Sequence, residues 1–313
     1  MDQAPYFADV ADGPEVAHAQ WVHARDGVRL RVVFWPLDTA KGTVFILPGR
    51  TECAEKYARG ARDLAALGYA SLAIDWRGQG LADRLLTDPN TGHVGTFADY
   101  QKDLRAVMAA AEAQNMPRPW FIIGHSMGGC IGLRTLMGHH PFAAAGFSAP
   151  MWGIGLKLWQ KVLALVFGPI ITAVGLAHLR AVGTKAQTYM LWHGFKDNLL
   201  TSDADMYDYM TRQVKTYPDL GLGGPSTQWV REAIAETTAL EALPSPDVPV
   251  LTFLGTDEKI VKTAKVRARM AQWPAGQLVE VAGGRHEIPM ETPATRAQFY
   301  GRLAELFDSV TRA

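Results

Sequence analysis

The sequence predicts an α/β fold with a mostly parallel sheet, helices on both faces and an inserted helical cap. Three observations support this prediction. Short apolar runs alternate with helix-like segments over residues 28–150. These runs are continuously apolar, as is typical of strands buried on both faces of a parallel sheet. The alternation stops over residues 151–243 and then resumes. We therefore expect a core in two parts, 1–150 and 244–313, with the cap at 151–243 between them.

Strands are predicted where short runs are rich in apolar, β-branched and aromatic residues. The segment 69–80 ends in the polar, glycine-rich loop "DWRGQG". The predicted strands are 28–37, 41–49, 69–80, 119–126, 142–150, 245–258 and 276–284.

Helices are predicted where apolar residues recur at a period of three to four. In the first of them, Tyr57, Ala61 and Leu64 follow this spacing and Gly68 marks the end. The predicted helices of the core are 55–68, 97–114, 127–140, 262–273 and 292–310.

Composition narrows the class of protein. The chain has 313 residues, of which 48% are hydrophobic, so it suits one large α/β domain with an insertion or two domains. Its formal net charge is zero and gives no basic surplus for binding nucleic acid. Cys53 and Cys130 are the only cysteines. Two cysteines form neither a disulfide framework nor a zinc cluster, and they suit a reducing compartment.

Two segments bear on the location of the protein. Residues 1–20 lack the charged start and apolar core of a secretory signal, so we expect a cytoplasmic protein. Residues 162–179 carry no Asp, Glu, Lys or Arg and approach the length of a membrane span. Gly168 and Pro169 interrupt this stretch, and a span there would separate two halves of one sheet. We expect instead a buried or interfacial helix pair.

The motif "GHSMG" at residues 124–128 directly follows the apolar run "WFII". In open parallel sheets, ligands bind beyond the carboxyl ends of the strands. Small residues at 124 and 128 permit a sharp strand-to-helix turn, as the G-x-S-x-G nucleophile elbow requires. A serine that only caps a helix is the alternative. The strand before and the helix after favour Ser126 as a nucleophile.

A serine needs an adjacent base to act as a nucleophile at neutral pH. His286 follows the last predicted strand, in "AGGRHEIP", where a loop can reach back over the sheet. His125 is next to the serine, and at an elbow its side chain should point away. The other histidines lie before the sheet core, in a loop, at a helix end or in the cap. Position therefore favours His286.

The histidine needs a carboxylate that fixes its tautomer and stabilises its cation. Asp257 lies just past a predicted strand in "LTFLGTDEKI", and its neighbour Glu258 is the second candidate. A turn or helix cap is the alternative role for Asp257. The order Ser126, Asp257, His286 is the nucleophile–acid–base order of this architecture.

An acyl-transfer site also needs hydrogen-bond donors for the oxyanion. One expected donor is the backbone N–H of Met127, after the nucleophile. The other is the backbone N–H of Arg50, in the loop that follows "TVFILPG". A solvated surface charge is an alternative for the Arg50 side chain, so the expectation concerns its backbone alone.

These motifs resemble those of the α/β-hydrolases of the monoacylglycerol lipase and bacterial lysophospholipase L2-like group (serine aminopeptidase S33, hydrolase-4). The resemblance covers nearly the whole chain. It implies a triad of Ser126, Asp257 and His286, with the amides of Arg50 and Met127 as oxyanion donors. The motifs that carry it are "LPGRTECAEKY", "IDWRGQGLADR", "GHSMGG", "LGTDEKIV", "GGRHEIPME" and, in the cap, "LTSDADMYDYM" and "LGGPSTQW".

One departure from the group separates its branches. Many relatives have His-Gly where this chain has Pro48–Gly49, whereas the bacterial lysophospholipase-like branch also shows Pro-Gly. The resemblance therefore favours that branch. We also expect "DWRGQG" to brace the oxyanion loop through Asp75 and Arg77.

The predicted function is hydrolysis of acyl esters of lysophospholipids or monoacylglycerols through an acyl-enzyme, with no metal or organic cofactor. Alternatives on the same fold are a small-ester esterase, an acyltransferase, a carbon–carbon bond hydrolase and a peptidase. A catalytically silent fold used for binding is a further class. Dehalogenases and epoxide hydrolases with an aspartate nucleophile are disfavoured because residue 126 is serine.

Aromatic residues of the predicted cap suggest a channel for an apolar acyl chain. Packing inside the cap explains each of them equally well. An apolar face on 154–176 could also contact a membrane surface, which in a cytoplasmic protein would be the inner membrane. The candidate channel residues are Trp152, Trp159, Phe167, Trp192 and Trp229.

Overall fold

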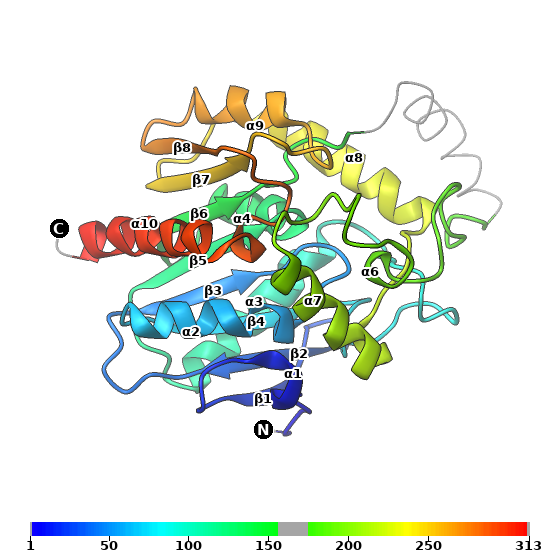
Figure 1. The fold of residues 1–313 in the computed structure, drawn as a ribbon, viewed down its shortest axis with the longest axis horizontal. Helices are drawn as coiled ribbons and strands as arrows, with labels where there is room; N and C mark the ends of the chain where they lie inside the picture. The colour runs from blue at the N-terminus through cyan, green and yellow to red at the C-terminus, as the bar shows by residue number, and fades with distance from the viewer. Residues whose placement is uncertain (1, 156–174, 312–313) are drawn as a thin grey trace.

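The computed structural model describes residues 2–155 and 175–311. Its strands form one sheet in the order β1-β2-β4-β3-β5-β6-β7-β8 (Figure 1). β2 pairs antiparallel with β1 and β4, and the remaining pairs are parallel. The prediction of a mostly parallel sheet is confirmed. The strands are β1 (His18–His23), β2 (Arg29–Trp35), β3 (Thr43–Leu47), β4 (Ala70–Asp75), β5 (Trp120–His125), β6 (Phe142–Ser148), β7 (Val250–Gly255) and β8 (Gly276–Val281).

Helices cover both faces of this sheet. Successive side chains of a strand point to opposite faces, so both must be covered if the whole strand is buried. Phe45 and Ile122 pack in one apolar cluster with residues of α3, α4 and α9. Ile46 and Phe121 pack in a second cluster with residues of α2 and α10. These helices are α2 (Ala58–Ala66), α3 (Asp99–Ala113), α4 (Met127–Leu136), α9 (Thr263–Met270) and α10 (Pro293–Thr311).

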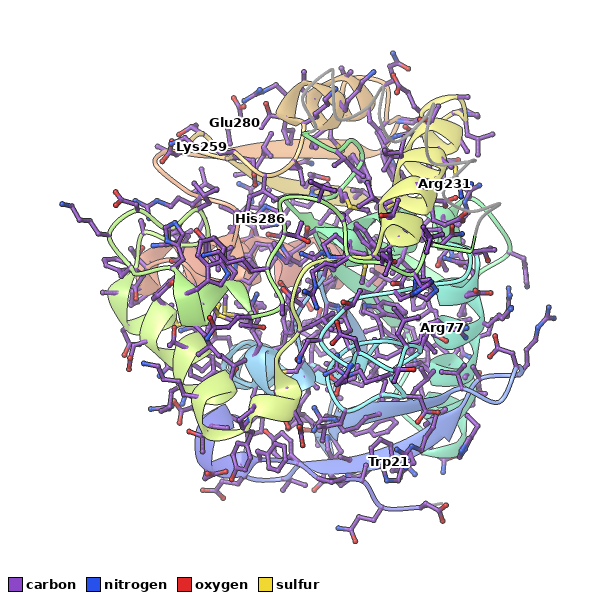
Figure 2. The ribbon with its side chains drawn as sticks, turned by 90° about the vertical axis from the view of Figure 1, so that its right-hand side faces the viewer. Trp21, Arg77, Arg231, Lys259, Glu280 and His286 are labelled. Atoms are coloured by element: carbon purple, nitrogen blue, oxygen red, sulfur yellow. The ribbon has the colours of Figure 1, made fainter. Side chains whose placement is uncertain are left out.

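The edge strand β1 was not predicted from the sequence. It pairs with β2 through contacts such as Trp21 with Arg31, and several of its residues are only partly buried. Trp21 lies at the periphery of the molecule (Figure 2), with the Arg29 guanidinium carbon 4.1 Å from the centre of its ring. As an edge strand it is less buried than the central strands, and its sequence "HAQWVH" carries polar residues and lacks a continuous apolar run.

In the described residues, the chain between β6 and β7 forms helices and turns. Its helices are α6 (Tyr189–Trp192), α7 (Ala204–Thr216), η2 (Pro218–Leu220) and α8 (Thr227–Glu241). Asp203 caps α7 by accepting a hydrogen bond from Met206 N, and Ser226 caps α8 by accepting one from Trp229 N. α6, α7 and α8 gather at one end of the sheet (Figure 1).

None of the helices in the described residues combines the length and the apolar content that crossing a bilayer requires. The apolar stretch 162–179 falls mostly outside the described residues, so its expected helix pair stays a prediction. The described remainder, 175–179, contains turns.

Candidate active site

Ser126 occupies a strained turn between β5 and α4. Its φ of 48° and ψ of −113° lie in a region that residues other than glycine rarely adopt. A Cβ atom at Gly128 would stand 1.9 Å from the carbonyl oxygen of Leu47, on the neighbouring strand β3. Only glycine therefore allows α4 to begin directly against β3. This close packing holds the serine at the apex of the turn, as the G-x-S-x-G motif predicts.

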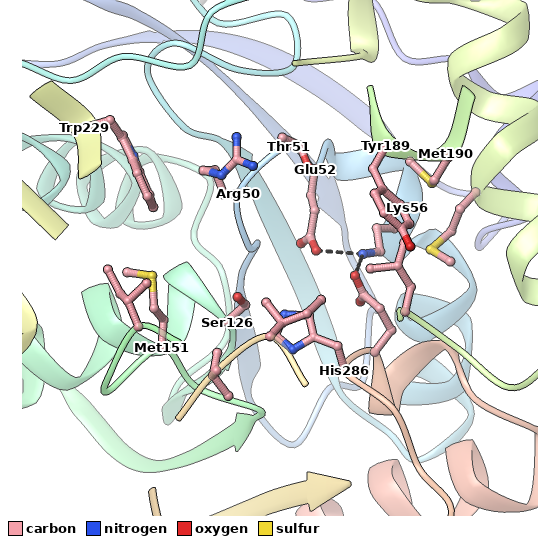
Figure 3. Close-up of a pocket in the computed structure, with 16 residues that line it drawn as sticks. Arg50, Thr51, Glu52, Lys56, Ser126, Met151, Tyr189, Met190, Trp229 and His286 are labelled. Carbon is pink, nitrogen blue, oxygen red and sulfur yellow. Dashed lines mark hydrogen bonds and ion pairs between the residues drawn. The ribbon is translucent and has the colours of Figure 1, made fainter. Parts of the chain in front are cut away.

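Ser126 lines a cavity of about 270 Å³ (Figure 3). Residues that follow β3 and β5 in the core line this cavity together with Met210 of α7 and Trp229 of α8. The helices inserted between β6 and β7 therefore close over the carboxyl ends of the strands. Further apolar lining comes from Met151, Ile154, Met190, Leu200, Ile260 and Val261.

His286 lies on the loop after β8 and lines the same cavity (Figures 2 and 3). Its Nδ1 is 2.7 Å from Oε2 of Glu258, and both residues are buried. With Nδ1–H donating to this carboxylate, Nε2 is left as the proton acceptor. Figure 3 shows the imidazole beside Ser126. Within the described residues no Ser126–His286 hydrogen bond is formed, and such bonds often tighten only once substrate is bound.

The prediction that Asp257 contacts the histidine is wrong. The Asp257 side chain is 44% exposed and forms an ion pair of 2.8 Å with Lys259, which lies at the periphery of the molecule (Figure 2). The turn after β7 directs Asp257 outward and Glu258 inward. The Glu258 carboxylate also accepts the backbone N–H of Ile260 and Val261. Glu258, the second candidate, thus takes the position of the acid.

The surroundings of Glu258 favour its ionised form. Burial acts to raise the pKa of this carboxyl group, but the hydrogen bond and charge of His286 and the two backbone N–H groups outweigh burial and lower the pKa. The carboxylate is therefore ionised at neutral pH and can stabilise a protonated His286.

The two predicted oxyanion donors lie on the segments that follow β5 and β3. Met127 begins α4 directly after the serine, and Arg50 follows β3 and lines the cavity. In the described part of the chain neither backbone N–H donates to another protein group, which leaves both free for a ligand oxygen.

Gln79 braces the oxyanion loop, Gly49–Glu52. Its Nε2 donates to the carbonyl oxygens of Gly49 (2.8 Å) and Glu52 (3.1 Å), and its Oε1 accepts from Thr51 N (3.4 Å). Glu52 adds an internal bond, because its carboxylate accepts from Gly49 N at 2.5 Å. Both backbone N–H and backbone carbonyl groups of the loop are thus hydrogen-bonded to side chains.

The expected bracing by Asp75 and Arg77 is corrected by these contacts. Arg77 forms ion pairs with Asp26 and Asp103 and does not hold the loop. Asp75 is paired with Arg31 and accepts from Ala54 N, just beyond the loop. The motif "DWRGQG" was the right segment, but its contacts with the loop come from Gln79, and Trp76 Nε1 donates to Pro48 O directly before the loop.

Four charged groups form a buried charge cluster beside the site, made of Glu52, Lys56, His125 and Glu287. Lys56 Nζ is 2.7 Å from Glu52 Oε1 and 2.6 Å from Glu287 Oε1 (Figure 3). His125 Nε2 is 3.2 Å from Glu287 Oε2, while its Nδ1 is 3.1 Å from the carbonyl oxygen of Ser148. The cluster joins the oxyanion loop to the residue after His286, so it fixes these two loops relative to each other.

The cluster is electrically balanced when His125 is protonated. Burial opposes the charge on His125, but the carboxylates of Glu287 and Glu52 raise its pKa above 6.5. For Glu287, the positive charges of His125 and Lys56 outweigh burial and lower the pKa. Glu52, His125 and Glu287 also lie close enough to hold a metal ion. Lys56 already bonds both carboxylates, so it supplies the positive charge that a metal would bring.

The balance in this cluster predicts a pH-dependent stability. Because His125 has a higher pKa when folded than its ordinary 6.5, its contribution is complete below pH 6.5 and is lost as pH rises through the folded pKa. We expect the difference in free energy of unfolding between wild type and His125→Asn to shrink over that pH window. The decrease should be about 1.4 kcal/mol for each unit by which folding raises the pKa of His125. Urea unfolding of both proteins from pH 6 upward measures it. A difference that stays constant with pH would contradict the protonated histidine.

The predicted channel tryptophans have different positions. Trp229 lines the cavity and donates from Nε1 to the Tyr100 hydroxyl. Trp152 packs in the core, where its Nε1 donates to Gly129 O and its ring stacks on Trp273. Trp192 is 41% exposed and is not among the described residues that line the cavity. The prediction that Trp152 and Trp192 line the channel is therefore wrong. Trp159 and Phe167 lie outside the described residues.

A mostly parallel sheet, a serine at the strand-to-helix turn and a histidine held by a carboxylate define the α/β-hydrolase class of enzymes. The model of the serine aminopeptidase S33 (Hydrolase_4) family matches residues 38–293. The chain belongs to this family, as its motifs predicted.

Individual relatives agree with this assignment. Lysophospholipase L2 of Escherichia coli K12 is 31% identical over 297 residues, covering 90% of this chain and 85% of the relative. Probable lysophospholipase L2 of Haemophilus influenzae is 25% identical over 305 residues and covers 95% of each chain. A soluble variant of monoglyceride lipase from Saccharomyces cerevisiae, solved with a substrate analog, has a TM-score of 0.74 at 21% identity and covers 98% of this chain and 99% of its own. This last likeness shows the shared fold.

Proposed function

We propose that the protein hydrolyses the acyl ester of lysophospholipids or monoacylglycerols, with Ser126, His286 and Glu258 as its catalytic triad. One observation carries the proposal. Ser126 and a histidine bonded to a buried carboxylate line one cavity, and most of the other residues that line it are apolar. The names of the bacterial relatives support the choice of a lysolipid ester.

In the proposed reaction, His286 Nε2 takes the proton of the Ser126 hydroxyl as its oxygen attacks the acyl carbonyl carbon. Glu258 holds the other ring nitrogen and stabilises the cation that forms. The oxyanion accepts hydrogen bonds from the amides of Arg50 and Met127, and losing one such donor typically slows a reaction about 10²- to 10³-fold. His286 then protonates the leaving alcohol, and water attacks the acyl-enzyme to release the fatty acid and the free serine.

The apolar lining of the cavity supports an acyl chain as the bound group. Met210 of α7 and Trp229 of α8 face the catalytic residues from the inserted segment. We propose that residues 151–243 act as a cap that excludes water from the ester and encloses part of the chain. The apolar face expected on 154–176 falls mostly outside the described residues, and in this proposal it would bring the cavity to a lipid surface. The cytoplasmic location and the contact with the inner membrane remain predictions of the sequence.

A matched substrate panel tests the proposal. Oleate release is measured from lysophosphatidylcholine, lysophosphatidylethanolamine and monooleoylglycerol, all carrying the oleoyl chain. Release of p-nitrophenol is measured from short p-nitrophenyl esters. We expect release from at least one of the long-chain lipids with a higher kcat/KM than for the short esters. Turnover of the short esters alone would contradict the lipid assignment and would leave a small-ester esterase or an acyltransferase.

A further inference from the structure

Arg50 presents a positive charge to the cavity. Its side chain reaches from the oxyanion loop toward Trp229 (Figure 3), whose ring centre is 5.5 Å from the guanidinium carbon. Nη1 donates to the carbonyl oxygen of Gly223 at 3.0 Å, which fixes the group in place. Within the described residues, Arg50 forms no ion pair with a carboxylate and its Nε and Nη2 donate to no other protein group.

The three fully buried cations, Arg31, Lys56 and Arg77, are each paired with carboxylates. Arg84 and Arg269, partly buried like Arg50, also form no ion pair within the described residues, but each of them donates to at least two carbonyl oxygens, whereas Arg50 donates to one. Placing a cation in a partly buried position without a counter-charge is unfavourable. Burial lowers the pKa of Arg50 to about 10, so the group is still charged at neutral pH. The cavity therefore holds a positive charge that forms no ion pair with a carboxylate in the described structure, although Glu52 lies near enough to favour the charged form.

The free edge of the guanidinium suits one kind of ligand. Nε and Nη2 share that edge, and an arginine binds two oxygens of a phosphate or carboxylate group through such a pair of donors. The backbone N–H of the same residue is the proposed oxyanion donor, so the reacting ester lies next to this side chain. In a lysophospholipid only the glycerol backbone separates the acyl ester from the phosphate.

We propose that the Arg50 side chain binds the phosphate of a lysophospholipid head group and thereby selects lysophospholipids over monoacylglycerols. This inference rests on the proposed function and specifies its substrate class. Arg50 then has two separate tasks, because its backbone N–H contacts the oxyanion and its guanidinium contacts the phosphate.

Two uncleavable competitors test the inference without requiring lipid turnover. Hexadecylphosphocholine carries a phosphate diester, and 1-O-hexadecylglycerol is an uncharged ether. Each is titrated, below the concentration at which it aggregates, as an inhibitor of p-nitrophenyl butyrate hydrolysis. Arg50→Gln keeps the backbone N–H and removes the charge. We expect it to reduce the preference for the phosphate compound by about ten- to hundred-fold, the effect of losing hydrogen bonds to a charged group. Arg50→Lys should recover part of this preference.

Matched controls separate the outcomes. Arg231→Gln removes a cation from α8 (Figure 2), the helix that carries Trp229, and should leave the ratio of inhibition constants unchanged. If Arg50→Gln weakens the binding of both competitors equally, or of neither, the proposed phosphate contact is wrong.

Inorganic phosphate and glycerophosphocholine are titrated as inhibitors in the same assay. Arg50-dependent inhibition by inorganic phosphate, with none by the phosphate lipid, would show a free-phosphate site and overturn the head-group assignment. The proposed function fails separately, if wild type releases no fatty acid from any long-chain ester.

Discussion

Ser126→Ala is expected to lower kcat/KM for a p-nitrophenyl ester, and for the lipid esters, by about 10⁴- to 10⁶-fold. The reason is that the alanine has no oxygen to form the acyl-enzyme, so His286 and the oxyanion amides can only assist water. The assay compares wild type and variant at matched concentrations. A variant that keeps a tenth of the wild-type rate would show that another residue is the nucleophile.

Folding of this variant is the necessary control. Alanine has the same backbone preferences as serine at the positive φ of residue 126, and the described structure gives the serine side chain no capping hydrogen bond. The thermal midpoint of Ser126→Ala should therefore lie within a few degrees of the wild-type value. If Ser126→Ala lost both its activity and its fold, the loss of activity would be no evidence that Ser126 is the nucleophile. A thermal scan distinguishes a folded, inactive variant from an unfolded one.

Glu258→Gln is expected to lower kcat by about 10³- to 10⁴-fold, whereas Asp257→Asn should leave it within about two- to three-fold of wild type. A neutral amide cannot stabilise the His286 cation and favours the wrong tautomer of the ring. The exposed Asp257 pairs with Lys259 and does not contact the histidine. Steady-state kinetics of the two variants side by side measures this contrast between neighbouring residues. A large loss in Asp257→Asn with little change in Glu258→Gln would contradict the site geometry.

Glu258→Asp serves as the conservative control for the second variant. It keeps the negative charge but shortens the side chain by one methylene, and the backbone donors Ile260 and Val261 hold the carboxylate close to its place. Activity between that of Glu258→Gln and wild type would indicate that the charge on His286 matters. A Glu258→Asp variant as inactive as Glu258→Gln would indicate that activity depends on the length of the side chain at position 258.

The positions of Ser126 and His286 could be predicted because local sequence determines them. Ser126 sits in a glycine motif between a strand and a helix, and only glycine fits at Gly128. His286 follows the last strand of the sheet. The carboxylate that contacts His286 could not be predicted in the same way, because Asp257 and Glu258 are adjacent in the chain. Which of them faces inward depends on the turn after β7, where Asp257 N bonds Gly284 O of the histidine loop.

Contacts between distant segments explain the other differences. Lys56 and Glu287 are 231 positions apart, so the buried charge cluster leaves no pattern in the sequence. Gln79 was missed for a related reason, since its amide reaches a loop that belongs to another strand. Aromatic content alone gives no direction to a side chain, and thus Trp152 and Trp192 were expected at a channel that Trp229 lines.

The central claim is that Ser126 is an activated nucleophile inside a cavity that binds acyl lipids. The most direct test is reaction with a long-chain alkyl fluorophosphonate, followed by mass spectrometry of the peptides. We predict a phosphonyl adduct on Ser126 in wild type, which excess monooleoylglycerol or lysophosphatidylcholine suppresses, and no adduct in Ser126→Ala. An adduct on another residue, or labelling of Ser126 that neither lipid slows, would contradict the claim.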